Sequence, residues 1–169
     1  MKEVLTIGFV ATAISPYFSE EQQVRIKSEN HLKKIIAEYD AKLICFHKTI
    51  FSKEDSVEAE KFFKNKIDFL ILQTSSCSSG EQLYPLCNIT NKMGLWAVPD
   101  LEKEGDVKLH SLVSVSHYLG IIKKILHEKK IKTKWFYNYG DTDEFKNKFL
   151  ITLRSVSYTH LRAHETTRY

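Results

Sequence analysis

A run of small polar side chains is the part of this sequence best equipped for chemistry. Five of the six residues at 74–79 are serine or threonine, and the sixth is Cys77. Such hydroxyl groups can hydrogen-bond a sugar or a phosphate, and a thiol near the start of a helix can act as a nucleophile with His110 or His117 as its base. Loop serines more often make turns and cap helices, so we favour a structural role for Cys77 and its neighbours.

The residues before this run indicate where it lies in the fold. Residues 67–72 are apolar except for Asp68, which is typical of a strand buried on both faces of a parallel sheet. Gly80 and Glu81 then begin a predicted helix. Open α/β sheets bind ligands at the carboxyl ends of their strands. We therefore expect the functional site at the loop that follows residue 72.

The remaining chain repeats the same alternation of strands and helices. Predicted strands cover residues 4–10, 41–46, 67–72, 95–98 and 134–139, with helical patterns between them. This predicts a three-layer doubly wound parallel α/β sheet, flavodoxin-like or Rossmann-like, with strand order 2-1-3-4-5. We expect the third helix to run from Gly80 to about Lys92, with a break at Pro85 and Gly94 as its cap. Both tryptophans, Trp96 and Trp135, are expected in the core.

Composition narrows the class of protein. The chain has 169 residues, is 43% hydrophobic and carries a net charge of +4 whose charges are interspersed, so we expect one domain and no nucleic-acid partner. Its three cysteines fit no metal spacing and indicate a reducing cytoplasm. No signal peptide and no stretch long enough to span a membrane is found, so we expect a cytoplasmic protein without membrane attachment.

Several nucleotide- and phosphate-binding classes are disfavoured by the loops. The six glycines are too scattered for a dinucleotide or P-loop motif. A receiver domain needs acidic residues after its first and third strands, where this chain has residues 11–13 and 73–74 instead. A flavodoxin-like phosphate loop using Thr12, Ser15 and the hydroxyls of residues 74–79 stays open, although the first loop has no glycine.

The last fifteen residues differ from the rest of the chain. Residues 155–169 show neither a helix nor a strand pattern, and residues 156–166 resemble a translated transposon-end and sequencing-adaptor sequence. We therefore expect residues 155–169 to be a non-native tail with few tertiary contacts, and the native protein to continue past Arg154. On this interpretation His160 and His164 are not a metal pair, and deleting the tail changes stability by less than about half a kcal/mol.

Four stretches, in order and spacing, resemble the amino-terminal part of the L-fucose/L-arabinose isomerase-related proteins. They are residues 70–81, 94–100 (Gly-Leu-Trp-Ala-Val-Pro-Asp), 109–114 and 134–137 with Gly140. The resemblance covers most of residues 4–154. This chain departs from the family at His110, where an asparagine is usual, and near Ser116 and His117, where a further asparagine is common.

The resemblance implies an activity that this chain does not complete by itself. The family interconverts an aldose and its ketose through an enediol, with a divalent ion, usually Mn²⁺, held by glutamate, aspartate and histidine ligands in later domains. No catalytic residue or metal ligand can be placed in residues 1–154. The family's amino-terminal domains help to build homo-oligomers and border a sugar site, which makes five residues the substrate-side candidates: Gln73, Ser75, Glu81, Trp96 and Asp100.

Two functions follow as expectations. The first is that residues 1–154 are the amino-terminal domain of a metal-dependent ketol-isomerase of carbohydrate metabolism, inactive without its catalytic half. The second is a stand-alone α/β module that binds a sugar or a nucleotide without catalysis. A continued reading frame with metal-ligand carboxylates favours the first, and an immediate native stop favours the second.

Overall fold

A computed structural model describes residues 4–14, 18–100 and 108–166, with side chains placed from Gln23 in the first helix to Thr159 in the last. The strands are β1 (Leu5–Thr12), β2 (Ala41–Cys45), β3 (Phe69–Thr74), β4 (Lys92–Ala97) and β5 (Lys132–Tyr137). The helices are α1 (Phe18–Ala37), α2 (Lys53–Phe63), α3 (Gly80–Leu86), α4 (Ser111–Lys124) and α5 (Asp143–Thr166), with a short 3-10 helix η1 (His127–Lys129).

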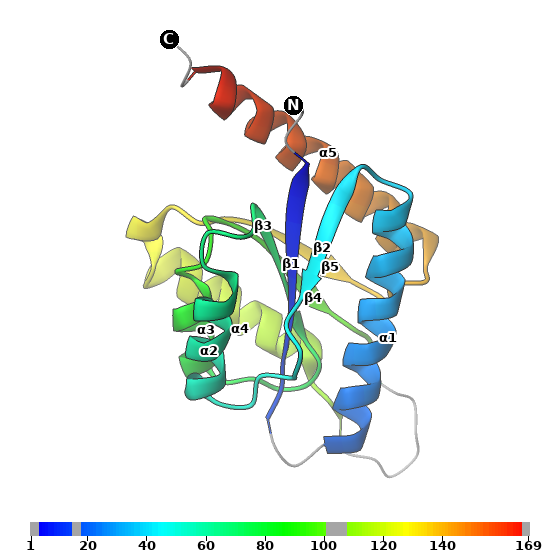
Figure 1. The fold of residues 1–169 in the computed structure, drawn as a ribbon. Coiled ribbons are helices and arrows are strands. Elements are labelled where there is room, and N and C mark those ends of the chain that lie inside the picture. The colour runs from blue at the N-terminus through cyan, green and yellow to red at the C-terminus, as the bar shows by residue number, and fades with distance from the viewer. Residues whose placement is uncertain (1–3, 15–17, 101–107, 167–169) are drawn as a thin grey trace.

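The five strands form one parallel sheet in the order β2-β1-β3-β4-β5. This confirms the predicted doubly wound α/β class and the predicted strand order. Strand β3 lies in the centre of the sheet, so the loop that follows it opens at the middle of the carboxyl edge. Helices cover both faces of the sheet (Figure 1).

Two hydrophobic layers pack on opposite faces of the sheet. Ile71 points to the layer formed with α1 and α5, whereas its neighbours Leu70 and Leu72 point to the layer formed with α2, α3 and α4. Successive strand side chains alternate between faces, so a central strand buried on both sides must be apolar throughout. This explains the continuous apolar run that the sequence shows before the hydroxyl-rich loop.

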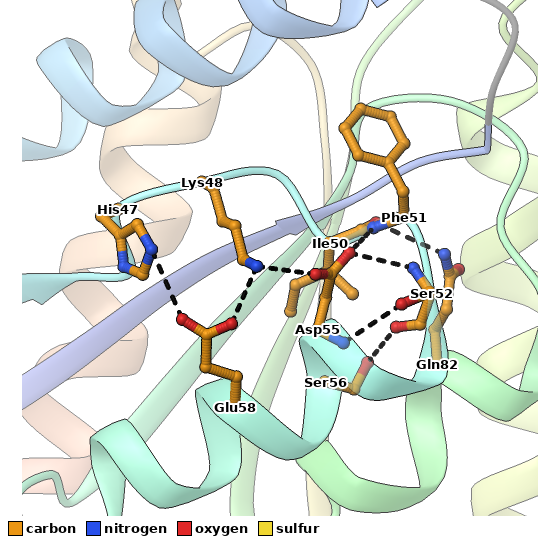
Figure 2. A network of polar contacts seen from close by, with 9 residues as sticks. All are labelled: His47, Lys48, Ile50, Phe51, Ser52, Asp55, Ser56, Glu58 and Gln82. Carbon is orange, nitrogen blue, oxygen red and sulfur yellow. Dashed lines mark hydrogen bonds and ion pairs between the residues drawn. The ribbon is translucent and has the colours of Figure 1, made fainter.

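The start of α2 is fixed by a polar network, shown in Figure 2. Asp55 accepts hydrogen bonds from the amides of Phe51 (3.0 Å) and Ser52 (3.2 Å), and Ser52 Oγ accepts one from the Asp55 amide, which completes a capping box. The Lys48 ammonium lies between Asp55 (2.7 Å) and Glu58 (2.8 Å). Burial opposes ionisation of Asp55, but Lys48 and the two amides outweigh it and lower its pKa.

Two predictions about the third helix were wrong. Helix α3 ends at Leu86, one residue after Pro85, and does not reach Lys92. Gly94 lies inside β4 and is not a helix cap. A Cβ at Gly94 would come within 2.7 Å of Ile71 and 2.8 Å of Phe136, so close packing of strand and side chains is the reason for glycine there.

The prediction that Trp135 belongs to the core was also wrong. Its side chain is 47% exposed, because β5 is an edge strand with only one neighbour in the sheet. The Lys148 ammonium from α5 lies 4.4 Å from the centre of the Trp135 ring, a cation–π contact. Trp96, on the adjacent interior strand, is fully buried as expected.

The prediction that residues after Arg154 lack helical structure was wrong as well. Helix α5 continues through Thr166, and its outer part projects beyond the sheet (Figure 1). Val156 is only 9% exposed and joins the apolar stripe of Phe145, Phe149 and Leu153. An existing helix extends at little cost, and Val156 falls three residues after Leu153 on the same face. The adaptor interpretation concerns the origin of these residues and stays a prediction.

Within the described residues, no helix combines the length and the hydrophobicity that crossing a lipid bilayer requires.

Candidate functional site

The carboxyl edge of the sheet carries a cluster of buried hydroxyl groups. Ser78 Oγ donates to Thr12 Oγ1 at 3.0 Å, which joins the loop after β3 to the end of β1. The Tyr118 hydroxyl of α4 lies 3.4 Å from the same threonine oxygen. Burial raises the pKa of Tyr118 to about 12, although its hydrogen bonds to Thr12 and Ser78 act in the opposite direction. Tyr118 is therefore a neutral hydrogen-bond donor at physiological pH.

A second group of hydrogen bonds joins the ends of β3 and β4 to the start of α4. Thr74 Oγ1 lies 2.8 Å from the carbonyl oxygen of Ser111 and 3.0 Å from its hydroxyl. Ser111 Oγ in turn donates to the Thr74 carbonyl and accepts from the Val98 amide at 2.9 Å. All three residues are buried, so this group holds two strand ends and one helix in fixed positions.

The rest of the loop is anchored in the same way. The Ser78 amide donates to Ser114 Oγ at 2.8 Å, and Ser76 Oγ accepts from the Ile14 amide at 3.2 Å. The Gln82 side chain donates to the carbonyls of Ala13 (2.8 Å) and Ile50 (3.3 Å), the second of which appears in Figure 2. The loop hydroxyls thus bond to the protein itself, and their first role is to tie the edge loops together.

Three of the five substrate-side candidates lie together and are buried. The side-chain amide of Gln73 donates a hydrogen bond from Nε2 to Ser28 Oγ of α1, and its Oε1 accepts one from Ser75 Oγ at 3.0 Å. Trp96 pairs with Gln73 in the strand register, packs on Phe145 and donates its indole N–H to the Asn138 carbonyl at 2.8 Å. All three have exposed fractions of 0%. Their role is therefore structural: they hold the ends of β3 and β4 in place from inside the protein.

The other two candidates lie elsewhere on the edge. Glu81 is exposed in the first turn of α3, on the face of the sheet opposite to α1. Asp100 is half-buried after β4, and its Oδ1 accepts from the His110 amide at 2.9 Å. The structure therefore brings Gln73, Ser75 and Trp96 together, whereas Glu81 lies in α3 and Asp100 bonds to His110 at the start of α4.

Cys77 lacks the surroundings of an activated nucleophile in the part of the chain that is described. Its side chain is half-buried, and no hydrogen bond joins its sulfur to His110 or His117. The His117 ring instead lies beside Gly80, where an added Cβ would be 3.6 Å from Nε2.

Sequence reasoning missed the contribution of α4 to this edge. Ser111, Ser114 and Tyr118 are spaced three and four residues apart, so they lie on one stripe of the helix. All three are buried and bond to the end of β3, to the loop after it or to the end of β1. A stripe of polar residues at helical spacing, in a helix whose other buried positions are apolar, was the signal that could have identified them.

The four stretches that carry the family resemblance meet at this edge. Thr74 of the first bonds to Ser111 of the third, and Ser78 of the first bonds to Ser114 of the third. The second stretch pairs with the fourth in the sheet, where Trp96 lies beside Phe136 and Ala97 beside Tyr137. Segments distant in sequence therefore share one hydrogen-bonded surface.

The described residues contain no group of three or more histidine, cysteine, aspartate or glutamate side chains that could hold a metal ion. A scan against protein-family models finds no match for the chain, and a search of curated proteins finds none either.

Proposed function

We propose that residues 1–154 form the amino-terminal α/β domain of a metal-dependent aldose–ketose isomerase that acts on a sugar resembling L-fucose or L-arabinose. One observation carries this proposal. The four stretches that resemble the isomerase-related family converge on a single edge of the sheet, linked by the bonds Thr74–Ser111 and Ser78–Ser114 and by the strand pairing of Trp96 with Phe136. Such convergence is expected of stretches that build one site together.

In this proposal the domain positions the sugar and the missing half of the enzyme performs the chemistry. A divalent ion such as Mn²⁺, bound by that half, would acidify a sugar hydroxyl and polarise the carbonyl. The edge of this domain supplies Glu81 and Asp100, whose carboxylate oxygens can accept hydrogen bonds from sugar hydroxyls. Gln73 and Ser75 fix the start of the loop after β3, and Trp96 links β4 to the residues after β5.

The same proposal includes a location and an assembly. We place the enzyme in the cytoplasm, because the three cysteines are free thiols in the structure. We also propose a homo-oligomer in which the edge of this domain borders the sugar site of a neighbouring subunit.

A stand-alone module that binds a small ligand without catalysis is the second candidate. A cavity of about 300 Å³ between α1 and the residues after β5 favours it, since a binding module needs a pocket of its own.

The genomic DNA downstream of codon 154 separates the two candidates. The isomerase proposal expects a continuous frame of several hundred codons that includes glutamate, aspartate and histidine metal ligands. A native stop codon directly after codon 154 would overturn it in favour of the binding module. The result does not depend on the folding or the activity of any variant.

A further inference from the structure

A cavity lies between α1 and the connection from β5 to α5, and seven of the described residues line it. Val24 and the buried hydroxyl of Ser28 form its floor, and His31 and Tyr139 flank it. The His31 side chain packs directly on Gly140, where an added Cβ would be 2.7 Å from the His31 Cβ. The remaining lining residues are Gln23, Lys27 and Asp141, whose side chains are exposed.

The polar side chains of this cavity differ from those of the hydroxyl cluster, because most of them have no hydrogen-bond partner among the described residues. Among the described residues, the side chains of Lys27, His31 and Asp141 make no hydrogen bond or ion pair, and that of Gln23 makes none either. Ser28, at 3% exposure, accepts a hydrogen bond from the Gln73 amide, which leaves its own hydroxyl proton available. The cavity therefore offers several donors and one carboxylate with no partner inside the described part of the protein.

The signs of these charges restrict the ligand. Lys27, with His31 and the Ser28 hydroxyl as further donors, suits a carboxylate. Asp141 and the Gln23 carbonyl suit hydroxyl donors. A hydroxyl group can donate to Asp141 without adding positive charge. An ammonium group at Asp141 would bring a second cation into a cavity that already contains Lys27. A volume of about 300 Å³ is at the small end of ligand pockets.

We propose that this cavity binds a small hydroxylated carboxylic acid, a sugar acid in chemical class. Its carboxylate lies at Lys27 and His31, and its hydroxyls face Asp141 and Gln23. The cavity is linked to the loop after β3 through the hydrogen bond from Gln73 to Ser28, but its ligand does not depend on the isomerase proposal.

NMR titration of the full ¹⁵N-labelled chain tests this site. D-gluconate has a carboxylate and hydroxyls, D-glucose has only hydroxyls, and acetate has only a carboxylate. Gluconate is expected to shift the amide signals of Lys27, His31, Tyr139 and Asp141 saturably at millimolar concentration, and to bind at least about tenfold more tightly than either partial ligand. Equal binding of glucose and gluconate, no saturable shift, or shifts centred elsewhere would overturn the proposal.

Variants of exposed residues assign the two ends of the ligand. Lys27→Gln is expected to weaken gluconate about tenfold, which is the loss of one charge-assisted hydrogen bond, while Lys34→Gln on the same helix but outside the cavity leaves binding unchanged. Asp141→Ala should weaken gluconate but not acetate. An unchanged gluconate affinity in Lys27→Gln contradicts the carboxylate position. Tighter binding of L-serine than of gluconate contradicts the hydroxylated class in favour of a zwitterion.

Discussion

His110 is the N-cap residue of α4 and has a left-handed backbone, at φ 56° and ψ 34°. An L-residue with a bulky side chain is strained there, and asparagine and glycine adopt this conformation at lower cost. The amide of His110 is held by Asp100, which maintains the strained geometry at the edge of the candidate site. The isomerase-related family, which this stretch resembles, usually has asparagine at this position, in agreement with the backbone requirement.

Replacing His110 by asparagine is therefore expected to stabilise the protein by about 0.5–1 kcal/mol. Urea unfolding followed by circular dichroism measures the difference in free energy of unfolding. His127→Asn, an exposed substitution in η1, is the matched control and should change little. An unchanged or lower stability of His110→Asn would show that the left-handed backbone is not a source of strain.

The three thiols should differ in reactivity. Burial raises the pKa of Cys45 and of Cys87 to about 12, so both thiols stay protonated at pH 8 and react slowly with disulfide reagents. Cys77, half-buried in the loop after β3, should react first. Titration of the native protein with Ellman's reagent is expected to release one fast equivalent, which Cys77→Ser removes. Rapid modification of Cys87 would contradict its buried position.

At the scale of single elements, the capping box of α2 makes a pH-dependent contribution. The pKa of Asp55 is lowered in the folded protein, so its contribution to stability is present above about pH 4 and is lost as pH falls through the lowered folded value. Asp55→Asn should cost about 1 kcal/mol at pH 7, and the gap should narrow in acid. Glu54→Gln, one residue earlier, is the control. A gap that stays constant down to pH 2 would contradict this assignment.

The end of α5 allows a second test at this scale. Val156→Ala is expected to cost about 1 kcal/mol, because the side chain is buried beside Leu153, whereas Ser155→Ala should change stability by less than about 0.5 kcal/mol. Deleting residues 155–169 should therefore cost more than the half kcal/mol expected from the sequence. Chemical unfolding of the three proteins measures these costs, and no loss in Val156→Ala would indicate that the contact contributes nothing.

Elements were predictable from the sequence where one local pattern decided them. The apolar run before Gln73 is typical of a strand buried on both faces, and the structure has β3 there. Gly94 and Trp135 were misassigned because their surroundings are set by partners distant in the chain. The side chains of Phe136 and Ile71 occupy the space that a side chain at Gly94 would need, and the position of β5 at the edge of the sheet exposes Trp135.

The candidate site was predicted in place but not in detail. Its position followed from the general rule for strand ends, whereas the burial of Gln73 and Trp96 depends on how α1 and α5 pack on the sheet. The cavity at Lys27 and Asp141 could not be predicted, because it arises where α1 meets a loop more than a hundred residues later.

At the scale of the whole molecule, the central claim is that this sheet edge belongs to an aldose–ketose isomerase whose metal site lies outside residues 1–154. The work is then divided between two halves: the described domain ties its edge loops together, and the later part binds the metal. Neither half is expected to convert a sugar by itself, because isomerisation needs a closed metal coordination sphere and a base beside C1–C2.

Ketose formation from L-fucose and L-arabinose is the most direct measurement, made with the product of the complete genomic reading frame and with residues 1–154 alone. With added Mn²⁺, the complete protein is expected to form ketose and to lose the activity on chelation, whereas residues 1–154 form none. Turnover by residues 1–154 alone would show that the active site lies within these residues, which contradicts the account. No turnover of these or related aldoses by the complete, folded and metal-loaded protein would contradict the isomerase assignment itself.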